Sequence, residues 1–189
     1  MATVTAPTSR PSPLSALNGR YHRALLNAFM VVVVLHWAEH LVQAYQIWVL
    51  GWPRPQARGL LGMAYPWLVT SEILHYGYAI VMLVGLALLL PGFAGRARLW
   101  WAVAFGLQFW HHIEHLLLLV QAQTGHNLLG RPVPTSIAQL VFERVELHLF
   151  YNSVVFLPML AAVYLHLRPN RRELTAATCT CARRVAVAA

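Results

Sequence analysis

The stretch ALLNAFMVVVVLHWAEHLVQAYQIWVL, residues Ala24–Leu50, decides the class of fold, because it is almost wholly apolar and contains no Arg or Lys. A helix rises about 1.5 Å per residue, so roughly 20 such residues cross the roughly 30 Å of hydrocarbon in a bilayer. The stretch is also too long for the apolar part of a cleavable signal peptide. It therefore predicts a membrane-spanning helix.

Three further apolar runs have a similar length: Pro66–Leu90, Ala97–Gln123 and Ser136–Leu167. The composition agrees, since 58% of the 189 residues are hydrophobic and only 11% are charged, whereas a soluble domain is about a quarter charged. We expect an all-α fold, an integral membrane four-helix bundle over residues 21–168. The Ser-, Pro- and Ala-rich segment 1–20 and the polar segment 169–189 are expected to be disordered tails.

The net charge of +8 comes from Arg alone, and its distribution predicts the topology. Ten Arg lie in the N-terminal segment, the loop between the second and third runs, and the C-terminal tail; three lie in the other two loops. By the positive-inside rule both termini are cytoplasmic in a multi-pass protein of the cell membrane. The basic excess then serves topology and contact with anionic lipid, and no nucleic-acid partner is expected.

A short pattern recurs along the chain and predicts an internal repeat. The first and third runs both contain H-x-x-E-H, at 36–40 and 111–115, and the second and fourth both contain H-x-x-Y, at 75–78 and 148–151. The offsets of 75 and 73 residues predict a helical hairpin that occurs twice, with both copies running the same way across the membrane. The alternative is two unrelated hairpins that need the same ligands.

The same motifs place ionisable side chains inside the predicted spans. Each such group costs at least about 2.5–3.5 kcal/mol at the centre of a bilayer, unless a partner satisfies it. On every predicted helix two or more of them lie three or four residues apart, on one face. Their depths converge on one level, which predicts a bound ion. The expected metal ligands are His36, Glu39, His40, His75, His111, Glu114, His115 and His148.

The remaining acidic residues of the spans, Glu72, Glu143 and Glu146, are the expected catalytic carboxylates, which bridge metals, orient ligands or transfer protons. Imidazole and carboxylate together suit iron, manganese, zinc or copper(II). The number of ligands favours two ions, with iron first, because di-iron bundle proteins use carboxylates plus Glu-x-x-His motifs from four helices, and Glu72-x-x-His75 has that form.

Two resemblances accompany these motifs. H-x-x-E-H resembles the zinc motif of inverzincin peptidases, which implies two His that bind zinc and a Glu that acts as the general base. Here, however, the motif lies within a predicted membrane span. The His-box pattern also resembles that of membrane di-iron hydroxylases and desaturases, which implies oxidation of a lipid. Those families cluster more histidines, paired late in each box, whereas His111 and His112 are paired early. The motifs assign no family.

The leading hypothesis is an oxidoreductase that uses two metal ions and oxygen on a lipophilic substrate or quinone. Three alternatives stay open. Histidines on facing helices hold haem in membrane cytochromes, intramembrane Glu and His also form transport pathways for protons or divalent metals, and Glu and His alone perform acid–base catalysis, as in a lipid isomerase. A transporter of four spans would need a homo-oligomer.

Cys179 and Cys181 form a Cys-x-Cys pair in the tail. No partner ligand is adjacent in the sequence, so we expect a reduced pair in a disordered segment. His22, His126 and His166 lie near the ends of the spans and are expected to be solvated.

Overall fold

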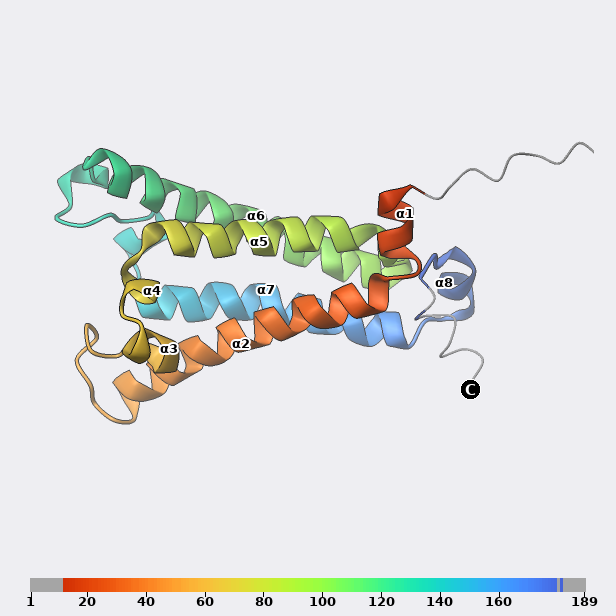
Figure 1. The fold of residues 1–189 in the computed structure, drawn as a ribbon, viewed down its shortest axis with the longest axis horizontal. Helices are drawn as coiled ribbons and strands as arrows, with labels where there is room; N and C mark the ends of the chain where they lie inside the picture. Colours follow the sequence, from red (N-terminus) through yellow and green to blue (C-terminus); the bar gives the residue numbers. More distant parts are fainter. Residues whose placement is uncertain (1–11, 180, 182–189) are drawn as a thin grey trace, which may run out of the picture.

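Four long helices lie side by side along the longest axis of the molecule (Figure 1). The structure is a computed structural model that describes residues 12–179 and 181, and the described residues form no strand. The long helices are α2 (His22–Trp48), α5 (Glu72–Leu89), α6 (Gly95–Thr124) and α7 (Arg144–Leu167). The short elements are α1 (Pro13–Asn18), α3 (Gly59–Ala64), α4 (Trp67–Thr70), η1 (Leu90–Gly92), η2 (Leu128–Gly130), η3 (Ala138–Leu140) and α8 (Arg171–Ala176).

The short elements gather at the two ends of the bundle (Figure 1). We call the end with α1 and α8 the terminal end, and the end with α3, α4, η2 and η3 the loop end. Within the bundle, α6 packs along both α5 and α7, and α2 completes the ring by contacting α5 and α7 less extensively. The long helices therefore enclose a common interior, with α2 as the least tightly held wall.

The all-helical class is confirmed, and three of the described helices are long and apolar enough to cross a membrane. These are α2, α5 together with η1, and α7. The helix α6 is not among them, because Gln, His and Glu interrupt its apolar sequence.

Two helices begin later than the apolar runs predict. In the second run, Ser71 takes an extended conformation, and its hydroxyl accepts a hydrogen bond from the Leu74 amide, so α5 starts at Glu72. In the fourth run, the chain forms η3 and a turn before Glu143, which is also extended, and α7 starts at Arg144. The predicted catalytic carboxylates therefore lie at helix N-termini, where the helix dipole favours negative charge, rather than in mid-span.

The terminal half of the bundle contains the apolar core. Leu86, Trp101 and Met159 are fully buried there, together with Phe29 and Val155. The Trp101 indole donates a hydrogen bond of 2.9 Å to the Leu86 carbonyl, so its single polar atom is satisfied. This packing separates the two ends of the molecule.

The described parts of the two predicted tails contain helices. Residues 1–11, 180 and 182–189 lie outside the described residues, whereas α1 and α8 fall within the segments that we expected to be disordered. Asn170 and Glu173 form a reciprocal capping box on α8. The Glu173 carboxylate also accepts hydrogen bonds from the Arg96 guanidinium, at 2.9 and 3.1 Å, and from the backbone amide of Arg96, at 3.0 Å. These partners are far from the tail in sequence, which is why its polar composition misled the prediction.

Candidate metal centre

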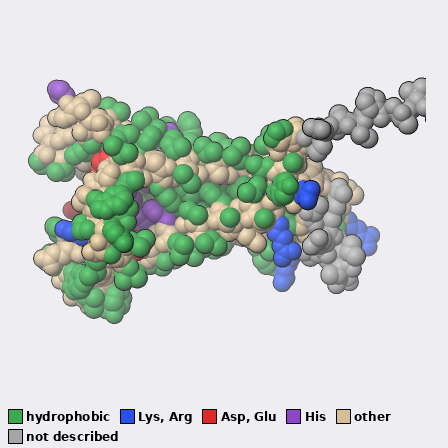
Figure 2. Space-filling model, in the orientation of Figure 1, with side chains coloured by type: hydrophobic (Ala, Val, Ile, Leu, Met, Phe, Trp, Pro, Cys, Tyr) green, Lys and Arg blue, Asp and Glu red, His purple; other side chains and the backbone are tan. Residues whose placement is uncertain are grey.

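Six histidines from all four long helices converge in the loop half of the bundle. His148 of α7 is central, and its ring centroid lies 5.3 Å from that of His115 and 5.4 Å from that of His40. The rings of His75 and His111 lie 6.1 and 5.9 Å from it. Figure 2 shows imidazole side chains within a hollow in this half, surrounded by hydrophobic side chains. The members of this six-histidine cluster are His36, His40, His75, His111, His115 and His148.

Two pairs within the cluster present their donor atoms together. The Nε2 atoms of His36 and His40 lie 3.2 Å apart, as do those of His111 and His115. Two imidazoles on one tetrahedral ion, each about 2.0–2.1 Å from it, place their nitrogens about 3.4 Å apart. Each i, i+4 pair therefore has the spacing that two ligands of one ion require.

Three of the rings have their other nitrogen fixed by an oxygen. The Nδ1 atom lies 2.7 Å from Gln43 Oε1 in His40, 2.8 Å from the Ser71 carbonyl in His75, and 2.7 Å from the Arg144 carbonyl in His148. These oxygens only accept, so each Nδ1 carries the proton and each Nε2 keeps a lone pair. The Nε2 atom of His148 is buried and has no hydrogen-bond partner. Histidines that bind metals are oriented in this way.

The two halves of the chain make matching contacts around these rings. His36 stacks on Tyr78 with centroids 3.6 Å apart, and His111 packs on Tyr151 at 4.4 Å. Both pairs join an H-x-x-E-H histidine to an H-x-x-Y tyrosine.

The match continues into the loops. Gln46 accepts a bond from the Gly59 amide and donates one to the Gly59 carbonyl, and Gln121 makes the same two bonds with Thr135. In sequence Gln121 follows Gln46 by 75 residues, the offset of the histidine motifs.

The carboxylates of the two motifs lie beside the cluster, with their oxygens on backbone amides. Glu39 accepts bonds from the amides of Leu61 and Gly62, at 2.7 and 3.1 Å, and Glu114 accepts from the Ala138 amide at 3.2 Å. Each carboxylate thus ties its helix to the loop that follows. The structure brings the six predicted imidazoles together, and the role of Glu39 and Glu114 as ligands stays a prediction.

The three predicted catalytic carboxylates lie toward the loop end. Glu72 forms a bidentate ion pair with Arg144, at 2.6 and 3.0 Å, and Glu146 pairs with Arg54. Glu143 is exposed at the start of α7. The arginine partners Arg54 and Arg144 line a cavity that reaches the cluster, and the catalytic role of the three carboxylates stays a prediction.

Two cavities reach the cluster from outside. One, of about 350 Å³, lies between α2, α3 and α5; its walls include Leu35, Leu61 and Leu74, and His36, His40 and His75 also line it. The other, of about 330 Å³, opens at the loop end. It is lined by Arg54, Arg58 and Arg144 together with His40, His75 and His148. The cluster is thus reached through one apolar cavity and one cavity lined by arginines, of which Arg54 and Arg144 are paired with Glu146 and Glu72.

The tightest group of ligand atoms lies at the terminal end, where the sequence predicted none. One ligand atom from each of four residues lies within 4.8 Å of all the others; among the described residues no other group of three or more does so. The four are His22, His166, Cys179 and Cys181.

Their surroundings overturn the expectation for these residues. His22 and His166 are buried rather than solvated, and the two cysteines are buried and joined by a disulfide. His126, by contrast, is exposed as expected. Only the fold brings residues 22, 166, 179 and 181 together, so no local spacing in the sequence reveals the group.

Comparison with known proteins gives no relative: no protein-family model matches the chain, and no similar protein is found among curated proteins or solved structures.

Proposed function

We propose that this chain is a membrane metalloprotein, an oxidoreductase that binds two redox-active metal ions in the six-histidine cluster and acts on a lipophilic substrate such as a quinone. The observation that carries the proposal is the orientation of His40, His75 and His148. Each ring has Nδ1 fixed by an oxygen and Nε2 left for a metal in a shared interior.

The proposal includes α6 as a fourth membrane span. Its outer face exposes large apolar side chains, including Leu99, Trp100, Phe109 and Val120. Its polar residues Gln108, His111, Glu114 and His115 are buried against the other helices. A helix with this distribution is suited to lipid outside and to a polar interior. With four spans, the arginine distribution favours a cytoplasmic position for the terminal end.

Two ions are favoured by the matching halves of the chain. By the repeat, His36, His40 and His75 would supply three imidazoles to one ion, and His111, His115 and His148 would supply three to the other. Only the two donors of each i, i+4 pair already have the spacing of one ion; the third donor of each set lies farther away and would have to move as the metal binds. The matching contacts around them support a duplicated hairpin, with one ion for each half. Imidazole suits iron, copper and zinc; iron, the metal expected from the sequence, and copper provide the redox chemistry.

The cavities favour a substrate with an apolar body and a polar head. The apolar cavity would hold the hydrocarbon part beside His36, and the arginine-lined cavity would hold a polar or anionic group. A transporter is less well supported, because the packed core around Trp101 fills the terminal half of the bundle. A haem protein is less well supported too, because haem takes two axial imidazoles, whereas six imidazoles meet here.

Elemental analysis of the full chain, purified in detergent, tests the proposal. We expect about two iron or copper ions per chain, with the ligand-field spectrum of an imidazole site. The variants His40→Ala and His115→Ala should lose this metal, because each removes one donor of an i, i+4 pair. His126→Ala is the matched control, since its exposed ring bonds only to Thr124, and it should retain the metal.

Two results would contradict the proposal. One is a folded protein whose metal content is the same in wild type and in both cluster variants. The other is full turnover of a quinone by protein from which a chelator has removed all metal, which would favour acid–base chemistry by Glu and His instead.

A further inference from the structure

The group of His22, His166, Cys179 and Cys181 at the terminal end is the most completely buried set of metal-type ligands in the described chain. The exposed fractions of the four side chains are 0%, 4%, 0% and 5%. They come from the start of α2, the end of α7 and the segment after α8. We propose that, when the cysteines are reduced, these residues form a tetrahedral zinc site that joins the C-terminal segment to the bundle.

The distances suit one ion among four ligands. Nε2 of His166 lies 2.9 Å from Sγ of Cys181, and Nδ1 of His22 lies 3.3 and 3.8 Å from the sulfurs of Cys179 and Cys181. A tetrahedral zinc ion, with bonds of about 2.3 Å to sulfur and 2.0–2.1 Å to nitrogen, separates these atoms by about 3.6 Å. Once the disulfide is reduced, the two sulfurs must move apart to about 3.8 Å to complete the site.

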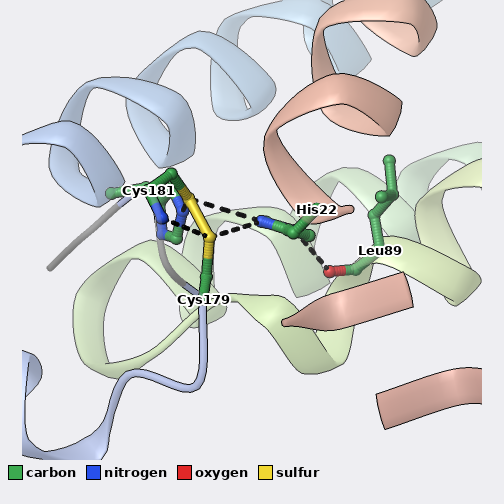
Figure 3. The surroundings of a disulfide bond; sticks show 5 residues. His22, Leu89, Cys179 and Cys181 are labelled. Carbon is green, nitrogen blue, oxygen red and sulfur yellow. Dashed lines mark hydrogen bonds between the residues drawn. A yellow bond between two sulfur atoms is a disulfide. The ribbon is translucent and has the colours of Figure 1, made fainter. Parts of the chain in front are cut away.

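The structure fixes the ring of His22 in the orientation that a ligand needs. Figure 3 shows the ring between the two sulfurs on one side and the Leu89 carbonyl on the other. Nε2 lies 3.3 Å from that carbonyl oxygen and donates to it, so Nδ1 faces the sulfurs without a proton. The backbone at Gly92 approaches closely, since an added Cβ there would lie 2.3 Å from Nε2. This carbonyl contact is typical of zinc-bound histidine.

The charge balance favours zinc in this buried position. Two thiolates and two neutral imidazoles cancel the charge of Zn²⁺, so the complete site is neutral and its burial carries no net charge. Thiolate with imidazole is also a common ligand set for structural zinc.

The disulfide between Cys179 and Cys181 is the oxidised form of the same group. A dithiol reductant supplies two electrons and two protons, which yields two thiols and the disulfide of the reductant. Zinc then displaces the two thiol protons as it binds. In a reducing compartment such as the cytoplasm, cysteines persist as thiols. This compartment follows from the proposed orientation, whereas the site itself does not depend on the six-histidine cluster.

A metal joins more of the molecule than the disulfide does. The disulfide closes a loop of three residues, and a loop so short constrains the chain little. A zinc ion instead connects α2, α7 and the C-terminal segment, which are distant in sequence. The site thus acts as a structural link at the terminal end.

The test uses the full chain with His40→Ala and His115→Ala, which removes the contribution of the six-histidine cluster. The protein is reduced with a phosphine and loaded with Zn²⁺ or Co²⁺ alone. We expect one zinc per chain, and with cobalt the thiolate charge-transfer band and intense d–d bands of a tetrahedral site. Cys179→Ser with Cys181→Ser should lose both signals. Thr178→Ala, an exposed neighbour, should keep them.

The oxidised form of the same protein provides a second comparison, and it requires no further substitution that could disturb folding. Once thiol titration shows that the disulfide has formed, zinc binding should fall at least tenfold. Reduced, folded protein that binds no zinc overturns the proposal, and so does zinc binding that is equal in the oxidised and reduced forms. Neither result affects the test of the six-histidine cluster.

Discussion

An imidazole offers two nitrogens, and in His75 and His148 the helix itself determines which one is free. Each ring donates its Nδ1 hydrogen to the carbonyl four residues earlier, at Ser71 and Arg144. The Ser71 carbonyl belongs to the residue that caps α5, and the Arg144 carbonyl belongs to the first residue of α7. The positions at which α5 and α7 begin therefore also determine the orientation of the His75 and His148 rings.

Substitution of Glu39 tests whether its carboxylate binds metal or caps α3, because in the structure the carboxylate is hydrogen-bonded to backbone amides. It accepts bonds from two amides at the start of α3, as a capping side chain does. We expect Glu39→Ala to lower the free energy of unfolding by about 1 kcal/mol and to leave the metal content unchanged. Thermal unfolding and elemental analysis of one preparation measure both.

Ala38→Ser, an exposed neighbour on the same helix, is the control for that substitution. If Glu39→Ala loses the metal at unchanged stability, the carboxylate is a ligand, as its spacing in H-x-x-E-H suggested.

At the scale of elements, the Glu173 carboxylate links α8 to Arg96 at the start of α6. The guanidinium of Arg96 bonds to Glu173 and lowers the pKa of that carboxyl group from 4.5 to about 2. Because the pKa in the folded state is the lower one, the ionised carboxylate stabilises the fold fully above about pH 4.5. This contribution is lost as the pH falls toward 2.

Glu173→Gln should therefore lower the melting temperature below that of the wild type at pH 6. At pH 3 the melting temperatures of variant and wild type should differ less, because the wild type has itself lost much of this contribution. Arg96 is half exposed, so solvent screens the pair, and we expect a difference of about 2–4 °C, equivalent to about 1 kcal/mol. The oxidised, metal-free protein is used, so that cysteine and metal do not titrate. A melting temperature that depends on pH equally in variant and wild type would show that this pair does not hold α8.

The elements also show what a sequence reveals and what it does not. The long apolar runs predict the helical class, and the 3.6-residue periodicity predicts that His36 and His40 share a face. The starts of α5 and α7 depend on the extended conformation of the single residues before them, Ser71 and Glu143. Hydropathy does not detect such a residue. His22 and Cys179, 157 residues apart, meet only because α2 and the segment after α8 lie at the same end.

At the scale of the whole molecule, polar groups are placed where the bundle is least tightly packed. The terminal half is closed by large apolar side chains, whereas the loop half holds the imidazoles and the cavities beside α2. A membrane-dissolved molecule would thus approach from the side of α2 and α5 and reach the histidines without crossing the bundle.

Filling the apolar cavity tests this route. Leu68→Trp places an indole in the cavity beside α3 and α5, and we expect binding of a short-chain quinone to weaken at least tenfold while the metal content stays constant. Leu160→Trp, on the exposed face of α7, is the control. Quinone titration followed by fluorescence gives both affinities, and equal affinities would place the substrate elsewhere.

Because every long helix supplies at least one imidazole, the order of synthesis sets when a metal can be acquired. A chain emerges from the ribosome N-terminus first, so His36 and His40 are synthesised long before their partner on α7. The six-histidine cluster is incomplete until residue 148 is inserted, and the cysteines follow some thirty residues later. If the cluster binds metal as proposed, loading would be one of the last events in the biogenesis of this protein, and a chain interrupted earlier would lack most of the proposed ligands.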